Sequence, residues 1–105
     1  MTDTTLPQVR DDPGHNRFVL ELDGHVGELQ YLTQPGRLIL VHTEVPEELG
    51  GRGVGGALVR AAVERARTEQ RTIVPWCPFA RRWLQQHEDV AATVAIDWDT
   101  PRPAR

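Results

Sequence analysis

The sequence lacks several features that define large classes of protein. Its 105 residues include one cysteine, Cys77. A lone cysteine cannot form an intrachain disulfide, so we expect a reducing compartment, the cytoplasm. No stretch approaches the ~20 apolar residues of a membrane-spanning helix, and the N-terminal residues have no apolar run typical of a secretory signal. We therefore expect no membrane partner.

An excess of positive charge is also missing. The chain carries 12 Lys and Arg against 15 Asp and Glu, which gives a formal net charge of -3. Nucleic-acid-binding surfaces need concentrated positive charge, so we expect a small-molecule partner and no nucleic acid. His15, His25 and His87 show no metal-ligand spacing with one another or with Cys77. The sequence therefore predicts no metal site.

The length of the chain fits one domain with one hydrophobic core. Residues 1–15 and 99–105 are poor in apolar side chains, and we expect both segments to be flexible. The folded domain is therefore predicted over residues 16–98, with no internal repeat.

Three antiparallel strands are predicted at the start of this domain. Residues 16–22 alternate between apolar and other side chains, the pattern of a half-buried strand. Asp23-Gly24 then predicts a hairpin, because both central positions of a type I′ turn need positive φ. The return strand is expected over 25–32, and a turn at 34–36 leads to a third strand over 37–45.

A helix and a parallel strand are predicted next. Apolar residues recur at helical spacing over 54–69, and the β-branched residues of 71–76 favour a short buried strand. This strand is expected to run parallel to the third one, because a helix separates them. Pro78 predicts a second helix to about His87, with Cys77 as its N-cap. The fold class is therefore α/β (α+β), and residues 90–98 fit either a helix or a strand.

A glycine-rich stretch, Gly50-Gly51-Arg52-Gly53-Val54-Gly55-Gly56, connects the third strand to the first helix. Glycines let backbone N–H groups converge, and a helix N-terminus adds unpaired donors and positive potential, which together favour a diphosphate ligand. The alternative is that the glycines only allow a tight connection. Two other phosphate-binding motifs do not fit, since no Lys-Ser or Lys-Thr pair follows and the β-β-β-α order lacks an early βαβ unit.

Three ordered blocks resemble the small YjdJ-type proteins of the GNAT acetyltransferase superfamily. They are His42-Thr43-Glu44-Val45-Pro46, Gly51-Arg52-Gly53-Val54-Gly55 and Pro75-Trp76-Cys77-Pro78-Phe79, and the similarity spans residues 16–90. The acetyl-CoA signature of the superfamily has Gln or Arg, two free positions, Gly, one free position, then Gly or Ala. Gly53-Val54-Gly55 matches the last three positions of this signature, but Gly50 replaces the leading Gln or Arg. A second register, from Arg52 through Gly55 to Ala57, satisfies every position.

The resemblance implies a minimal GNAT-like fold, in which the strand before the glycines splays from the strand after the helix. The pantetheine arm of acetyl-CoA enters this gap. Glu44 and Val45 are then expected to offer main-chain contacts to pantetheine, and Cys77 to lie near the thioester. The pyrophosphate is expected to be held by Gly50, Gly51, Arg52, Gly53, Val54, Gly55 and Gly56.

Two residues are candidates for catalysis. Cys77 at a helix N-terminus is placed where a thiolate is stabilised, so it is expected either to accept the acetyl group or to protonate the departing thiolate. The alternative is a cysteine buried for packing.

His42 and Glu44 are two apart on a strand and share a face. His42 is therefore a candidate general base, with a hydrogen-bonded sheet residue as the alternative. Phe79, Trp83 and Leu84 have the spacing of a helix face that packs on the sheet.

These observations predict an enzyme, an acetyl-CoA-dependent N-acetyltransferase that acts on an amine of unidentified structure. Acetyl-CoA is the expected co-substrate. A non-catalytic acyl-CoA-binding or regulatory module would need the same loop but neither Cys77 nor His42. A purely structural domain would use the glycines as turn-makers only. The sequence does not determine the oligomeric state.

Overall fold

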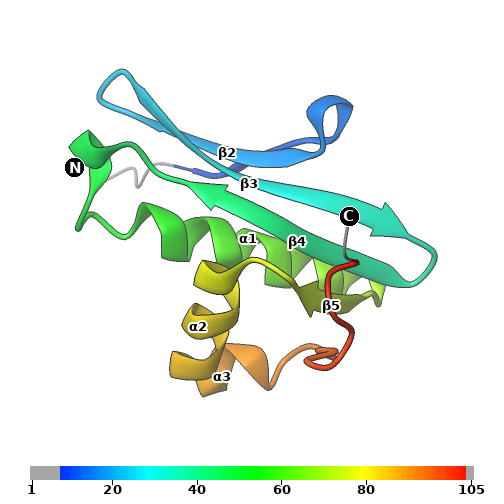
Figure 1. The fold of residues 1–105 in the computed structure, drawn as a ribbon. Coiled ribbons are helices and arrows are strands. Elements are labelled where there is room, and N and C mark those ends of the chain that lie inside the picture. Colours follow the sequence, from blue (N-terminus) through cyan, green and yellow to red (C-terminus); the bar gives the residue numbers. More distant parts are fainter. Residues whose placement is uncertain (1–7, 104–105) are drawn as a thin grey trace, which may run out of the picture.

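Alternating apolar side chains build a five-stranded sheet in the computed structural model, which describes residues 8–103 (Figure 1). The first four strands are antiparallel neighbours, and the fifth lies parallel to the fourth. The predicted α+β fold, with its antiparallel start and later parallel strand, is confirmed. In sheet order the strands are β1 (Arg10–Asp12), β2 (Arg17–Leu22), β3 (His25–Gln34), β4 (Arg37–Glu44) and β5 (Thr72–Pro75).

The two hairpin turns form where turn residues interrupt the apolar pattern. Asp23 and Gly24 join β2 to β3 with φ of 53° and 79°, which confirms the positive φ expected at both positions. Gly36 joins β3 to β4 with φ of 71°, a conformation that glycine adopts without strain.

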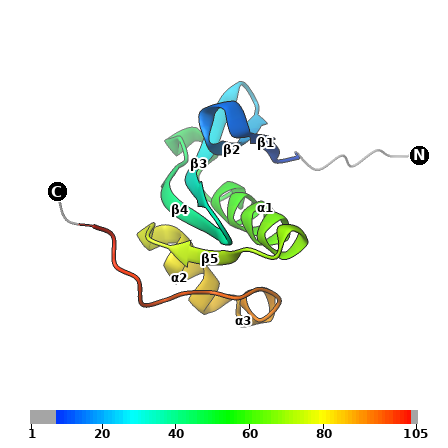
Figure 2. The same cartoon turned by 90° about the vertical axis from the view of Figure 1, so that its right-hand side faces the viewer.

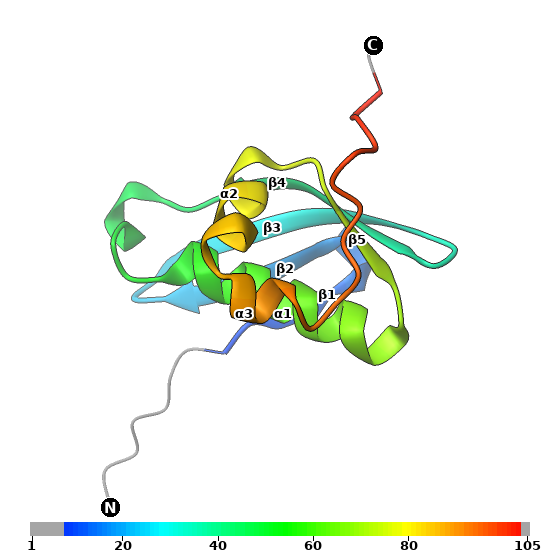
Figure 3. The ribbon, with the colours of Figure 1, turned by 90° about the horizontal axis from the view of Figure 1, so that it is seen from below.

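The helices lie on one face of the sheet. α1 (Val54–Glu69) connects β4 to β5 and lies in the curve of the sheet, and α2 (Pro78–Gln86) and α3 (Glu88–Ala91) follow β5 (Figures 2 and 3). Two 3-10 turns, Pro13–His15 and Glu47–Leu49, complete the elements. Among the helices of residues 8–103, none has the length and apolar character needed to cross a membrane.

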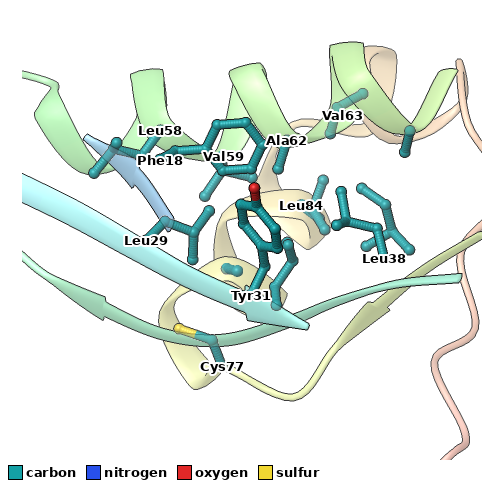
Figure 4. Close-up of a cluster of buried hydrophobic side chains, with 14 of the residues drawn as sticks. Phe18, Leu29, Tyr31, Leu38, Leu58, Val59, Ala62, Val63, Cys77 and Leu84 are labelled. Carbon is teal, nitrogen blue, oxygen red and sulfur yellow. The ribbon is translucent and has the colours of Figure 1, made fainter. Parts of the chain in front are cut away.

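The hydrophobic core lies between the sheet and these helices (Figure 4). Burying one large apolar side chain contributes about 1.5–3 kcal/mol, and the stripe of α1 predicted from its spacing supplies several. Cys77 and Leu84 extend the core to α2. The strands contribute Phe18, Leu20, Leu29, Tyr31, Leu38 and Leu40, and α1 contributes Leu58, Val59, Ala62, Val63 and Ala66.

The N-terminal boundary differs from the prediction. The sequence predicts a flexible segment over 1–15, but β1 within it pairs with β2. Asp11 of β1 accepts a hydrogen bond from the Tyr31 hydroxyl at 2.5 Å and pairs with Arg65 at 3.0 Å. A three-residue charged strand has no apolar alternation to reveal it, because pairing and polar contacts hold it in place. Residues 1–7 lie outside the described part of the chain.

The C-terminal part is mixed in character. Residues 90–98 include the end of α3 and an isolated parallel bridge between Ile73 and Ile96. Arg37 then pairs with Asp97 at 2.8 Å, and the Trp76 indole donates to the Thr100 carbonyl at 3.0 Å. Thr100 falls in the predicted flexible tail 99–105, yet polar contacts attach it to the sheet. Residues 104–105 lie outside the described range.

Candidate functional site

β4 and β5 separate halfway along β4. Their parallel pairing runs from Arg37 and Thr72 to Leu40 and Pro75. The Cys77 amide then donates to the Leu40 carbonyl at 2.9 Å. Beyond this point β4 continues to Glu44 paired with β3. Within residues 8–103, no strand pairs with the other edge of this end segment, so its main chain is free to bind an extended ligand.

A β-bulge lies at the point of separation. Tyr31 of β3 pairs with Leu40, but its neighbour Gln30 pairs with His42, which leaves Val41 as an additional residue in β4. A bulge of this kind bends the strand and shifts the alternation of its side chains. After the bulge, each β4 side chain therefore points to the side of the sheet opposite the one it would take in a regular strand.

The bulge determines which side chains face the helices. Thr43 lies opposite Leu29, a core residue, and therefore faces α1 and α2. His42 and Glu44 face the other side of the sheet, as their spacing predicts. We call this side the open face.

Cys77 lies on the helix side. Its side chain belongs to the core and is 2% exposed, and its Sγ lies 3.2 Å from Thr43 Oγ1. It caps α2 as expected, but its side chain makes no capping hydrogen bond. Cys77 and His42 therefore flank β4 from opposite faces. A ligand atom that meets both must lie beside the free edge of β4.

His42 is accessible from solvent. Its Nε2 lies 3.5 Å from Glu44 Oε1, and the two side chains are 53% and 70% exposed. A contact this long and this exposed does not bury the imidazole. The imidazole therefore remains free to exchange a proton with a ligand on the open face.

The glycine-rich stretch forms a cradle of amides where α1 begins. Gly51 and Gly53 have φ of 75° and 77°, and Gly53 is the N-cap with no side-chain cap. The first helical bond runs from the Ala57 amide to the Gly53 carbonyl at 3.0 Å. The amides of residues 54–56 consequently have no acceptor in the helix, and the helix dipole adds positive potential there.

A cavity of about 360 Å³ lies against this cradle and is closed on one side by Phe79 and Trp83 of α2. A Cβ on Gly55 would lie 2.5 Å from the Phe79 ring, and one on Gly56 would lie 2.6 Å from the Trp83 indole nitrogen. These two glycines therefore also allow α1 and α2 to approach closely. The cavity is lined by seven of the predicted cofactor residues: Val45, Gly50, Gly51, Gly53, Val54, Gly55 and Gly56.

The two remaining predicted cofactor residues do not line the cavity. Arg52 reaches the β2–β3 turn, where its Nη1 lies 2.7 Å from Asp23 Oδ2. The Glu44 side chain points to the open face, which leaves its main chain as the group available to a ligand. Among residues 8–103, no three His, Cys, Asp or Glu side chains come together in a way that could hold a metal ion.

Sequence reasoning missed three residues at this site. Phe79 is predicted to pack on the sheet but is 43% exposed beside the cradle. Trp83 stacks on His87 with ring centroids 3.8 Å apart. The adjacent glycines at 55 and 56 are the sequence signal for both aromatic contacts, since glycine pairs mark close helix approach. No sequence signal marks Thr43, because its side chain faces the helices only as a result of the bulge at Val41.

Comparisons with known proteins give one family and one similar solved structure. The model of the GCN5-related N-acetyltransferase family matches residues 17–94. The NMR solution structure of a GCN5-like candidate N-acetyltransferase from Staphylococcus aureus is similar, with a TM-score of 0.66 and 26% sequence identity. The match covers 91% of this chain and 96% of that chain. No curated protein sequence matches the chain.

Proposed function

The chain belongs to the GCN5-related N-acetyltransferase family, and we propose that it transfers the acetyl group of acetyl-CoA to an amine. The observation that supports this most strongly is the amide cradle at the start of α1, next to the free edge of β4. We also propose that the protein acts in the cytoplasm, since its one cysteine cannot form an intrachain disulfide.

Coenzyme A fits the residues that surround the cradle. A Cβ built on Gly51 or Gly53 meets nothing within 4 Å, so the backbone there is open to a pyrophosphate. The main chain of Glu44 and Val45 would hold the pantetheine arm along the free edge of β4. Phe79 supplies an exposed apolar surface beside it.

Acetyl transfer requires a C–N bond to form as the C–S bond breaks. The attacking amine must lose a proton, and the departing thiolate gains one. His42, exposed on the open face, is the group that accepts the proton of the amine. An amine approaching from this face reaches the thioester beside the free edge of β4.

Proton donation is the role that best fits Cys77. Its Sγ is paired with the Thr43 hydroxyl, and within residues 8–103 no carboxylate or imidazole forms a hydrogen bond with it. A nucleophilic cysteine needs a base or a charged neighbour to become a thiolate. Protonating the thiolate of coenzyme A requires no such neighbour, and the Cys77 thiol recovers its proton from solvent after product release.

A non-catalytic acyl-CoA-binding module is the second candidate, and the 2% exposure of Cys77 favours it. Calorimetry with acetyl-CoA, combined with an assay of thiol release across a panel of amines, separates the two. Binding with amine-dependent thiol release supports the transferase. Binding without release supports the module, and no binding at high ligand excess contradicts both.

A further inference from the structure

A second cavity, of about 380 Å³, lies on the open face of the sheet. Polar side chains from neighbouring strands line it, and they form a row across the sheet. Arg17 of β2 pairs with Gln30 of β3, which pairs with His42 of β4. Gln30 and Val41 line the cavity and His42 does not, so the cavity borders the residue proposed as the general base without including it.

This cavity and the glycine-lined cavity lie at opposite ends of the free segment of β4. Val41, the bulge residue, lines the first, and Val45 lines the second. Four residues of strand span about 13 Å, a distance that an extended pantetheine arm can bridge. With its pyrophosphate at the Val45 end, acetyl-CoA would present its acetyl group near Val41. The open-face cavity is then the route left for the acceptor.

Two carboxylates near the cavity, those of Glu28 and Glu44, differ in how well they are paired. Glu28 and Glu44 are directly opposite each other on β3 and β4, and like charges in this position are unfavourable. Glu28 accepts hydrogen bonds from Arg17 and Gln30, both at 2.8 Å. Among residues 8–103, the Glu44 carboxylate has one charged neighbour within ion-pair distance, His42 at 3.5 Å. A positive group placed between the two carboxylates would relieve their repulsion.

Arg17 does not remove this imbalance. Its Nε also contacts Asp12 at 3.3 Å, so one guanidinium faces two carboxylates, Asp12 and Glu28. Hydrogen bonds from Gln30 and Arg17 hold the pKa of Glu28 below its usual value, and the carboxylate stays charged at neutral pH. The border of the open-face cavity therefore carries the carboxylates of Asp12, Glu28 and Glu44 and the guanidinium of Arg17, and of these four groups Glu28 and Arg17 line the cavity itself.

We propose that this cavity is the acceptor subsite and that it takes a small amine with a second positive charge, such as a diamine. One amino group reacts beside His42, and the other ammonium lies against Glu28 and Glu44. The inference rests on the proposed acetyl transfer, and it adds the class of the acceptor.

The first test compares three acceptors of similar length in the thiol-release assay: 1,4-diaminobutane, butylamine and 4-aminobutyrate. We expect the highest kcat/KM with the diamine and the lowest with the amino acid, whose carboxylate meets the negative face. Glu28→Gln and Glu44→Gln should each lower kcat/KM for the diamine about fivefold, with a smaller effect on butylamine. Glu21→Gln is the matched control. Glu21 lies on the open face of β2, as Arg17 does, but its partner on β3 is Val26 and it does not line the cavity.

The second test measures binding without turnover. Calorimetry of 1,4-diaminobutane with the protein saturated in coenzyme A should give a Kd that rises about fivefold in Glu44→Gln and stays unchanged in Glu21→Gln. Glu44 is 70% exposed, so this variant is expected to fold even if Glu28→Gln does not.

The outcomes distinguish the two proposals. Diamine binding that Glu44→Gln weakens, without acetylation, would show a diamine site but contradict the transferase, and with it the role of this cavity as an acceptor subsite. Acetylation of all three amines with equal kcat/KM, unaffected by either variant, would support the transferase and overturn the subsite. Failure of the diamine to bind the coenzyme A complex would also overturn the subsite.

Discussion

Thr43 and Cys77 meet on the helix side of the sheet, with Oγ1 and Sγ 3.2 Å apart. The preceding residue, His42, points to the open face. The bulge at Val41 produces this arrangement, since it sets the direction of every later side chain of β4. The proposed proton acceptor and proton donor therefore approach a thioester from opposite sides.

Replacing Cys77 tests its role as the acid. We expect Cys77→Ala to lower kcat about 100-fold, with the Kd for acetyl-CoA unchanged. Thr43→Val, which keeps the side-chain size but removes the hydroxyl, should lower kcat by less, and Thr43→Ser should behave as wild type. Steady-state thiol release gives kcat, and calorimetry gives the Kd. Unchanged turnover in Cys77→Ala would remove Cys77 from the mechanism.

Gly53→Ala tests the cradle against a matched control at Gly36. Both glycines have positive φ, 77° and 71°, and at both a Cβ meets nothing within 4 Å. Each substitution should lower the free energy of unfolding by about 1–2 kcal/mol through backbone strain. Only Gly53→Ala should also weaken coenzyme A binding. Equal affinity in the two variants would separate the glycines from cofactor binding.

The pH dependence of turnover tests His42. A general base accepts a proton only in its unprotonated form, so a base at this position predicts a kcat that rises from acid to neutral pH. We expect His42→Gln to have a lower kcat that no longer rises in this range. Rate profiles at saturating acetyl-CoA provide the measurement, and a rise of unchanged shape in the variant would rule out the base role.

Tyr31 predicts a loss of stability at alkaline pH. Burial, and then the hydrogen bond to Asp11, raise the pKa of Tyr31 to about 12. Unfolded tyrosine ionises near pH 10. The folded state thus holds the proton more tightly, and the free energy of unfolding should fall between about pH 10 and 12. Urea unfolding across this range measures it, and Tyr31→Phe should flatten the slope. An equal slope in the variant would assign the effect to other groups.

The fold was largely predictable from local patterns. Asp23-Gly24 and the 54–69 helical stripe are signals that depend on neighbouring residues only, and the structure confirms both. β1 was not predictable, because its stability comes from Asp11 contacts with residues far along the chain. The position of Ile96 beside Ile73 depends on tertiary pairing in the same way.

The sequence predicted which residues of the glycine-rich stretch lie together, but not where the side chains of Cys77, His42 and Arg52 point. Seven predicted cofactor residues share one cavity because consecutive residues of a tight loop must lie together. His42 lies on the face opposite Cys77 because the bulge at Val41 shifts the direction of the later β4 side chains. No feature of the local sequence marks this bulge. Arg52 is similarly drawn to Asp23, a partner 29 positions away in sequence.

An NMR titration of the ¹⁵N-labelled protein with coenzyme A determines whether the start of α1 binds the cofactor. We expect the largest amide shifts on residues 51–57 and smaller ones along the end of β4, and Gly53→Ala should reduce them at equal ligand concentration. Saturating coenzyme A that shifts only amides remote from the start of α1, or none, would contradict it.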